Sequence, residues 1–541
     1  MLRASRRQGT SVGGLAFTAV RMPEPPAQRT PLSSPAVAGE RPSSPPEDER
    51  TSSPSKKVGG VVIKNALFLT LGRVAGMPLS ILASAVSARY LGPAALGFMY
   101  LGFTMNSMGN LAVDWGQSGA LPQRVAQDRA RAGVLLGTSL VWRVAMSVAT
   151  LGAMILASRA LGYDRDFLPV LCLIALAYFF SSIGGAAQQV IIGYERTDVS
   201  AYSQIIEQLA GLAFTVPVLM LGGKVNEYLL ASAAAGFVGM AYGWRSLRLV
   251  GDVRMSFRVD VLKALLVSST PFAFTSVVVV LQPYLDALFL SKFAVPEVIG
   301  WHAAARKLVG VLIFPASAMV GALYPTLCRL YGTDRDTFLS TANGALRGTS
   351  LMVFPVALGC FLYPGIGISI FSEAGFAPAE DNLRVMSLFI FLVYFTMPLG
   401  VAILAAGKQR AWALVQSLCV LVSLVADPLL IPIAQRHFGN GGLGVCVAAV
   451  LSEVLVVGCT VWMTPEGTFD RRFWRAALSA MVGGAAMALA AYSLRSLNQF
   501  VAAFLALAAY LGGVWASGGL EPDFVRAVRN IFGSKLARTR G

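Results

Sequence analysis

The sequence predicts an all-α integral membrane protein that crosses the bilayer about fourteen times. First, 55% of its 541 residues are hydrophobic and only 13% are charged, whereas a soluble domain carries about a quarter charged residues. Second, apolar stretches long enough to cross a hydrocarbon core of about 30 Å follow one another from residue 61 to residue 518. Third, a short motif occurs twice at corresponding places, which indicates two similar halves.

The expected spans are apolar stretches bounded by short polar connections. Each has at least the roughly 20 residues that a membrane-spanning helix needs. In chain order they are 62–88, 95–118, 133–158, 167–190, 199–222, 226–246, 263–290, 297–326, 338–363, 383–405, 411–434, 442–463, 474–494 and 499–518. An even number of spans puts both ends of the chain on the same side of the membrane.

The basic residues of the connections predict the orientation. With the N-terminus in the cytoplasm, the inner connections and the tail after residue 520 hold about twenty-one Lys and Arg, against about seven in the outer connections. The positive-inside rule therefore places both termini in the cytoplasm, and the net charge of +16 is mostly topological. Because no basic soluble domain carries this charge, we expect no nucleic-acid partner.

The two ends of the chain differ from the spans. Residues 1–60 are rich in Pro, Ser, Arg and Glu, which excludes a packed core, so we expect a disordered cytoplasmic tail that starts at Met1 or at Met22. Residues 521–541 mix apolar and basic residues, which suits an amphipathic helix on the anionic inner leaflet, with a frayed basic tail as the alternative. The six cysteines show neither metal-binding nor disulfide spacing, and we expect no metal site or cofactor.

The repeated motif predicts the architecture. Its copies, "RYLGPAALGF" at 89–98 and "KFAVPEVIGW" at 292–301, follow the first and the seventh span. Because six spans separate them, the halves cross the membrane in the same direction, which predicts two six-helix lobes related by a pseudo-twofold axis along the membrane normal. The expected lobes are residues 61–250 and 251–464, and residues 465–520 form two further helices. The proline and glycine of each copy fit a sharp turn between helices.

Five stretches of the chain resemble one known family. They are "ARYLGPAALGF" from Ala88, "DWGQSGALPQRVA" from Asp114, "YLDALFLSKFAVPEVIGWHAAARKL" from Tyr284, "FPASAMVGALYPTLCRLY" from Phe314 and "DPLLIPIAQRHFGNGGLGVCVAAVLSE" from Asp427. In this order they are similar to the polysaccharide-transporter branch of the MOP flippases, the Wzx-type lipid-linked oligosaccharide flippases, over about residues 61–518. The sequence departs from the family at His302, where tyrosine is frequent, and at Asp427, where asparagine is frequent.

The resemblance implies a two-lobe, MurJ-like fold and a transporter that is not an enzyme. The implied activity is the movement of an undecaprenyl-diphosphate-linked oligosaccharide repeat unit from the inner to the outer leaflet of a bacterial inner membrane, by alternating access. The unit then joins an O-antigen, a capsule or an exopolysaccharide. The implied partners are the lipid-linked glycan, the bilayer, and polysaccharide polymerase and chain-length or export proteins.

Cations inside the spans are candidate functional residues, because a charge at the bilayer centre costs at least about 2.5–3.5 kcal/mol. The candidates for binding a pyrophosphate in a central cavity are Arg73, Arg143, Arg306, Lys307 and Arg347. Arginine pairs bidentately with phosphate oxygens and stays charged. Salt bridges or helix packing are the alternative for Arg73 and Arg143, and snorkelling is the alternative for Arg347. Arg306 and Lys307 point about 100° apart, so we expect only one of them to face the cavity.

Carboxylates inside the spans are candidates for coupling transport to an H⁺ or Na⁺ gradient. These candidates are Asp286, Glu207 and Asp114, with Asp286 preferred. Asp114 and Asp427 lie near expected helix ends, where solvation is easy, and Glu453 suits a hydrogen bond between helices. Direct use of the membrane potential is the alternative to an ion.

Three other functions stay open. A multidrug or organic-cation antiporter of the same superfamily would share the fold, and a lipid II flippase would share the cationic cavity as well. A membrane glycosyltransferase or polymerase is the alternative from another class, because Asp164-Arg-Asp166 and Asp334-Arg-Asp336 imitate the D-x-D metal site of nucleotide-sugar enzymes. These pairs lie in short connections on opposite sides of the membrane with no soluble domain beside them, so we prefer the flippase.

Overall fold

A computed structural model describes residues 54–251, 253–371, 373–464 and 467–519. Within these ranges the secondary structure is helical, with no strand. Most of the expected N-terminal tail and the whole of the expected C-terminal amphipathic tail lie outside the described residues. The first helix begins at Pro54, a few residues inside the stretch that we expected to be a tail.

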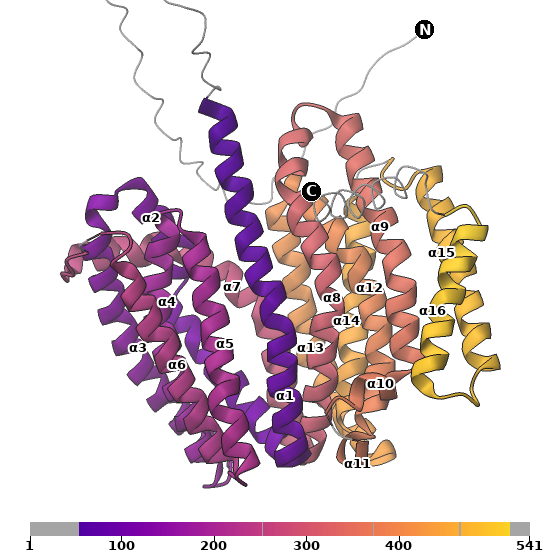
Figure 1. Ribbon diagram of the computed structural model, residues 1–541, viewed down its shortest axis with the longest axis horizontal. Coiled ribbons are helices and arrows are strands. Elements are labelled where there is room, and N and C mark those ends of the chain that lie inside the picture. Colours follow the sequence, from indigo (N-terminus) through magenta and orange to yellow (C-terminus); the bar gives the residue numbers. More distant parts are fainter. Residues whose placement is uncertain (1–53, 252, 372, 465–466, 520–541) are drawn as a thin grey trace, which may run out of the picture. The chain divides into compact units, whose positions relative to one another are not determined.

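The helices connect through short turns along the whole described chain (Figure 1). In chain order they are α1 (Pro54–Asp114), α2 (Gln117–Gln127), the 3₁₀ helix η1 (Arg129–Arg131), α3 (Ala132–Ala160), α4 (Phe167–Gly193), α5 (Thr197–Met220), α6 (Val225–Leu247), α7 (Val259–Phe293), α8 (Pro296–Tyr331), α9 (Arg335–Leu362), α10 (Pro364–Ile368), α11 (Glu373–Phe376), α12 (Ala379–Ala405), α13 (Gln409–Phe438), α14 (Gly442–Met463), α15 (Arg471–Ser493) and α16 (Gln499–Ala516).

Each expected span coincides with a helical segment. The first two spans lie in α1, which turns at Gly92, where φ is 79° and ψ is 176°. Glycine tolerates this positive φ, and Pro93 then starts the second segment with a φ that is already helical. Eleven segments of the described chain are long and apolar enough to cross a membrane, and α6 and α7 are of similar length without being among them. The protein is therefore a multi-pass membrane protein.

The helices pack as two sets. Helices α2 to α6 form one set, in which α4 packs along α6 and α3, and α5 packs along α6. Helices α8, α9, α12, α13 and α14 form the other, around fully buried Tyr394, Phe371 and Phe376. Helices α15 and α16 pack against each other, and α15 also packs against α9 (Figure 1). The pair α15–α16 thus extends the second set.

Helix α7 contacts both sets, although the expected lobe boundary lies before it. Its first half packs against α2, where a Cβ on Gly116 would lie 2.4 Å from the backbone oxygen of Ser269. Its second half packs against α13. Pro271 and Pro283 both lie inside α7. Each proline removes one backbone hydrogen bond, which permits α7 to bend between its two packing partners.

Candidate functional site

Arg143 forms a buried polar node among three helices. Its side chain is 3% exposed, and its guanidinium forms an ion pair with Asp114 of α1 at 2.6 Å. It also donates to Ser139 on α3 and to Ser182 and Gln189 on α4, over 3.1–3.3 Å. Arginine has five N–H donors, and the five acceptor atoms here match that number. The node thus holds α1, α3 and α4 in register.

Two expected site residues are therefore partners of each other. Asp114 accepts from Arg143 and also from the backbone and hydroxyl of Ser118, at 3.2 and 2.8 Å. This arrangement favours the salt-bridge alternative for Arg143 over a cation that is free to bind substrate. Arg73 lies in α1, but its side chain is outside the described residues, and its role stays a prediction.

Arg306 and Lys307 point to different partners, as expected for adjacent residues of one helix. The ammonium of Lys307 donates to the hydroxyl of Ser80 on α1, at 2.7 Å. The guanidinium of Arg306 lies 5.8 Å from the ring centre of Phe389 on α12 and interacts electrostatically with Asp286. Lys307 thus faces the first half of the chain, and Arg306 faces the second set of helices.

The remaining predicted residues lie at helix contacts. Arg347 is half-buried in α9, with its guanidinium beside Gly344. Glu207 on α5 accepts from the hydroxyl of Ser181 on α4 at 2.7 Å. Glu453 on α14 accepts from the hydroxyl of Thr396 on α12, which is the helix-to-helix hydrogen bond that the sequence suggested.

A buried acidic pair lies between α7 and α13. Asp286 is 3% exposed and Asp427 is fully buried, and the two carboxyl groups interact electrostatically. Among the described residues, one oxygen of Asp286, both oxygens of Asp427 and the hydroxyl of Ser423 have no hydrogen-bond partner. Buried polar groups are nearly always satisfied in folded proteins. Two ionised carboxyl groups side by side have no proton to share, whereas a proton on either one would give both groups a hydrogen bond.

The burial of Asp427 corrects one expectation. We expected it near a helix end, where solvation is easy, but α13 runs on to Phe438 and Asp427 faces α7 inside the protein. Sequence reasoning missed its partnership with Asp286 because the two residues lie far apart in the chain. The available signal was Ser423, one helical turn before Asp427, which places two polar groups on one face of an apolar helix.

The two copies of the repeated motif pack against each other. A Cβ on Gly97 would lie 1.9 Å from the carbonyl oxygen of Pro296, and a Cβ on Gly300 would lie 2.0 Å from the carbonyl oxygen of Pro93. Each glycine of one copy thus contacts the proline of the other copy, with no room for a side chain. Such reciprocal contact is what a pseudo-twofold axis between the copies produces.

The cation that begins each copy also reaches the opposite half of the chain. Arg89 donates to the backbone oxygens of Ile370 and Ser369, both at 3.0 Å. Lys292 donates to the backbone oxygen of Leu161 at the end of α3, and its ammonium lies 4.0 Å from the ring centre of Tyr163. The two motifs therefore form a symmetric clasp between the halves, which we call the hinge clasp.

One aspartate of the D-x-D-like pairs has a structural role. Asp334 caps α9 by accepting from the backbone N–H and the hydroxyl of Thr337, at 3.0 and 2.5 Å. These two donors hold the pKa of the Asp334 carboxyl below its ordinary value. Within the described chain, no group of three or more His, Cys, Asp or Glu residues is arranged to hold a metal ion. Asp334 is thus a helix cap.

Comparison with sequence families gives one match. Residues 62–331 match the polysaccharide biosynthesis protein family. That stretch runs from the first span to the end of α8 and holds both copies of the repeated motif. No curated protein matches the chain.

Comparison with solved structures shows the fold. A lipid II flippase MurJ in an inward closed conformation has a TM-score of 0.67 and 13% identity, and the match covers 87% of this chain and 100% of that one. An inward-facing multidrug resistance MATE family transporter of the MOP superfamily has a TM-score of 0.59 and 17% identity, and the match covers 72% of this chain and 93% of that one. A MOP superfamily transporter from Pyrococcus furiosus has a TM-score of 0.53 and 15% identity, and the match covers 74% of this chain and 94% of that one. The expected MurJ-like fold is confirmed.

Proposed function

We propose that this protein is a Wzx-type flippase that moves an undecaprenyl-diphosphate-linked oligosaccharide repeat unit across a bacterial inner membrane. The observation that carries the proposal is the match of residues 62–331 to the polysaccharide biosynthesis family within a fold shared with a lipid II flippase. The protein acts as a transporter and not as an enzyme, and both termini lie in the cytoplasm. Its product feeds the assembly of an O-antigen, a capsule or an exopolysaccharide, with polymerase and chain-length or export proteins as partners.

In alternating access, the hinge clasp would hold the two halves closed on the outer side of the membrane. The clasp lies where the first and seventh spans end, which is the outer side in the proposed orientation. With Gly97 and Gly300 in contact with the opposite prolines, the halves are closed together at that side. Opening to the outside requires these contacts and the bonds of Arg89 and Lys292 to separate. The substrate then leaves toward the outer leaflet.

Lys307 is the best candidate among the described cations for binding the pyrophosphate. It bonds to the hydroxyl of Ser80, and it has no ion pair with any described carboxylate. A phosphate oxygen can therefore replace a neutral hydroxyl and gain a charge-assisted hydrogen bond. Arg143 is less suited, because Asp114 already neutralises it. Arg73, Arg306 and Arg347 remain candidates for the same role.

We also propose that Asp286 and Asp427 couple transport to H⁺ or Na⁺. Two buried carboxyl groups repel each other when both are ionised, so binding one cation between them is favoured. The contacts of α7 with both sets of helices suit this role, because a change between α7 and α13 reaches the first half of the chain. Asp286→Asn in proteoliposomes should remove the dependence of transport on an imposed ion gradient. Unchanged dependence would assign the driving force to another site or to the membrane potential.

The experiment that tests the function is a gene deletion followed by lipid extraction and mass spectrometry. We expect a pyrophosphate-linked oligosaccharide to accumulate while the matching surface polysaccharide disappears, with both effects reversed by the wild-type gene. Accumulation of lipid II instead would identify a peptidoglycan-precursor flippase, which the MurJ likeness keeps as the second candidate. Normal lipids with increased sensitivity to organic cations would favour the antiporter. Absence of the completed repeat unit would favour the enzyme.

A further inference from the structure

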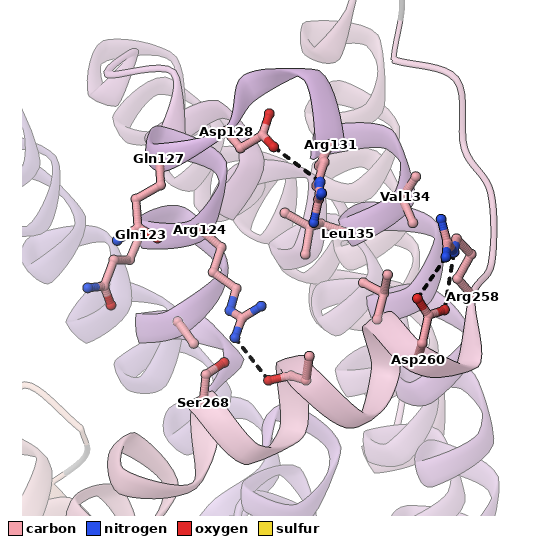
Figure 2. Close-up of a pocket in the computed structure, with 13 residues that line it drawn as sticks. Gln123, Arg124, Gln127, Asp128, Arg131, Val134, Leu135, Arg258, Asp260 and Ser268 are labelled. Atoms are coloured by element: carbon pink, nitrogen blue, oxygen red, sulfur yellow. Dashed lines mark hydrogen bonds and ion pairs between the residues drawn. The ribbon is translucent and has the colours of Figure 1, made fainter. Parts of the chain in front are cut away.

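Two polar pockets lie at corresponding places in the two halves of the chain. The first, of about 640 Å³, is formed by α2, η1, the start of α3 and the start of α7 (Figure 2). The second, of about 830 Å³, is formed by the ends of α8 and α14, the start of α9 and the turn between α12 and α13. Each includes the connection that follows the second span of its lobe. Both therefore open on one side of the membrane, the cytoplasmic side in the proposed orientation.

The first pocket holds three arginines, two of which are paired with carboxylates. Figure 2 shows Arg131 paired with Asp128 and Arg258 paired with Asp260, and the N···O distances are 3.2 and 2.8 Å. Arg124 points across the pocket from α2 and donates to a backbone oxygen of α7 at 3.1 Å. Two carboxylates thus offset two of the three lining cations. An anion gains little from such a pocket.

The second pocket differs because no carboxylate of the described residues lines it. Its lining includes Arg335 at the start of α9 and Lys408 before α13, both exposed. The ammonium of Lys408 donates to the backbone oxygen of Met463 at 3.1 Å, which fixes its position without neutralising its charge. Asp334 precedes Arg335 in the chain, but its carboxylate is held by Thr337. The described lining of the pocket therefore carries a net positive charge.

Aromatic side chains complete the second pocket. Trp462 at the end of α14 is 86% exposed, and Tyr331 at the end of α8 is 47% exposed. The Tyr331 ring packs edge-on against the buried Phe338, with ring centres 5.4 Å apart. Trp and Tyr gather at the level of the lipid headgroups, because their rings are apolar with one polar group. Exposed aromatics beside two cations place this pocket at the membrane–water boundary.

We propose that the second pocket binds the headgroup of an anionic phospholipid of the inner leaflet. Arg335 and Lys408 contact the phosphate, and Trp462 and Tyr331 lie along the glycerol backbone and the first carbons of the acyl chains. Basic pockets between the cytoplasmic ends of membrane helices suit anionic lipid headgroups. The lipid is a ligand distinct from the transported substrate, and this site does not depend on the proposed function.

The test measures quenching of Trp462 fluorescence by brominated lipid. The full chain is reconstituted in phosphatidylcholine vesicles that contain a rising fraction of phosphatidylglycerol brominated on its acyl chains, and the Trp462→Phe variant supplies the background from the other tryptophans. We expect the Trp462 signal to be quenched at a lower mole fraction of phosphatidylglycerol than of equally brominated phosphatidylcholine. Arg335→Gln should raise the half-quenching mole fraction about fivefold, and adding Lys408→Gln should raise it about a further fivefold.

The matched control is Arg131→Gln, which removes one cation from the corresponding pocket of the other half and should leave quenching unchanged. Arg335→Gln leaves the bond from Lys408 to Met463 intact, so its effect separates lipid binding from folding; thermal unfolding checks this. Equal quenching by the two lipids, or an equal effect of Arg131→Gln, would overturn the proposal. Loss of the preference in millimolar inorganic phosphate, with ionic strength held constant, would assign the pocket to a soluble anion and would overturn the lipid assignment.

Discussion

At the scale of single residues, the neighbours of each charge decide what it can do. Arg143 and Asp114 were expected as separate site residues, yet they neutralise each other. Among the described residues Lys307 donates to a neutral hydroxyl, and Asp286 faces a second buried carboxyl group. The sequence could predict that these residues are embedded, because apolar stretches surround them. It could not predict their partners, because each partner comes from another helix.

The Arg143 node gives a prediction about stability. Arg143→Met should destabilise the protein by about 3 kcal/mol, because it leaves the Asp114 carboxylate and several polar groups without a donor in a mostly buried place. Adding Asp114→Leu should recover most of that loss, because no unpaired charge then remains. Thermal unfolding in detergent measures both effects. A folded, fully stable Arg143→Met protein with reduced transport would instead return Arg143 to the substrate-binding role.

At the scale of helices, the length of each apolar stretch was enough to predict the long helices. Every expected span coincides with a helical segment, but the shorter helices α2, α10 and α11 were not predicted. Helices α10 and α11 hold too few residues for a periodic pattern, and α2 follows the second span without being long enough to cross a membrane. The turn inside α1 depends on Gly92, which the repeated motif pointed to. The motif alone could not predict that its two copies contact each other directly.

The hinge clasp gives a prediction at this scale. Gly97→Val and Gly300→Val should each favour the form that is open at the clasp, because a side chain there overlaps a backbone oxygen of the opposite copy. In a background without the native cysteines, a single cysteine at Ser291 should react faster with a membrane-impermeant maleimide in these variants. Gly152→Ala is the control, because space around Gly152 is open. Equal reaction rates in all variants would show that the clasp does not control access.

At the scale of the whole molecule, two similar halves meet through the clasp and share α7. The repeat allowed the sequence to predict two lobes, because matched motifs six spans apart imply matched topology. The expected lobe boundary lies before α7, and the packing of this helix on α2 and α3 as well as on α13 is what the repeat did not predict. That arrangement depends on contacts between distant segments, such as Gly116 with Ser269, which no local pattern reveals.

The most direct test of the central claim is transport by the purified protein in vesicles that contain a polyprenyl-pyrophosphate-linked oligosaccharide. An impermeant sugar-modifying enzyme outside the vesicles measures how much of the glycan reaches the outer leaflet. We predict that the wild-type protein makes nearly all of the glycan accessible, and that Lys307→Gln slows this severalfold while remaining folded. If the glycan stays protected with wild-type protein, although the protein is folded and correctly inserted, the account of this protein as a flippase is contradicted.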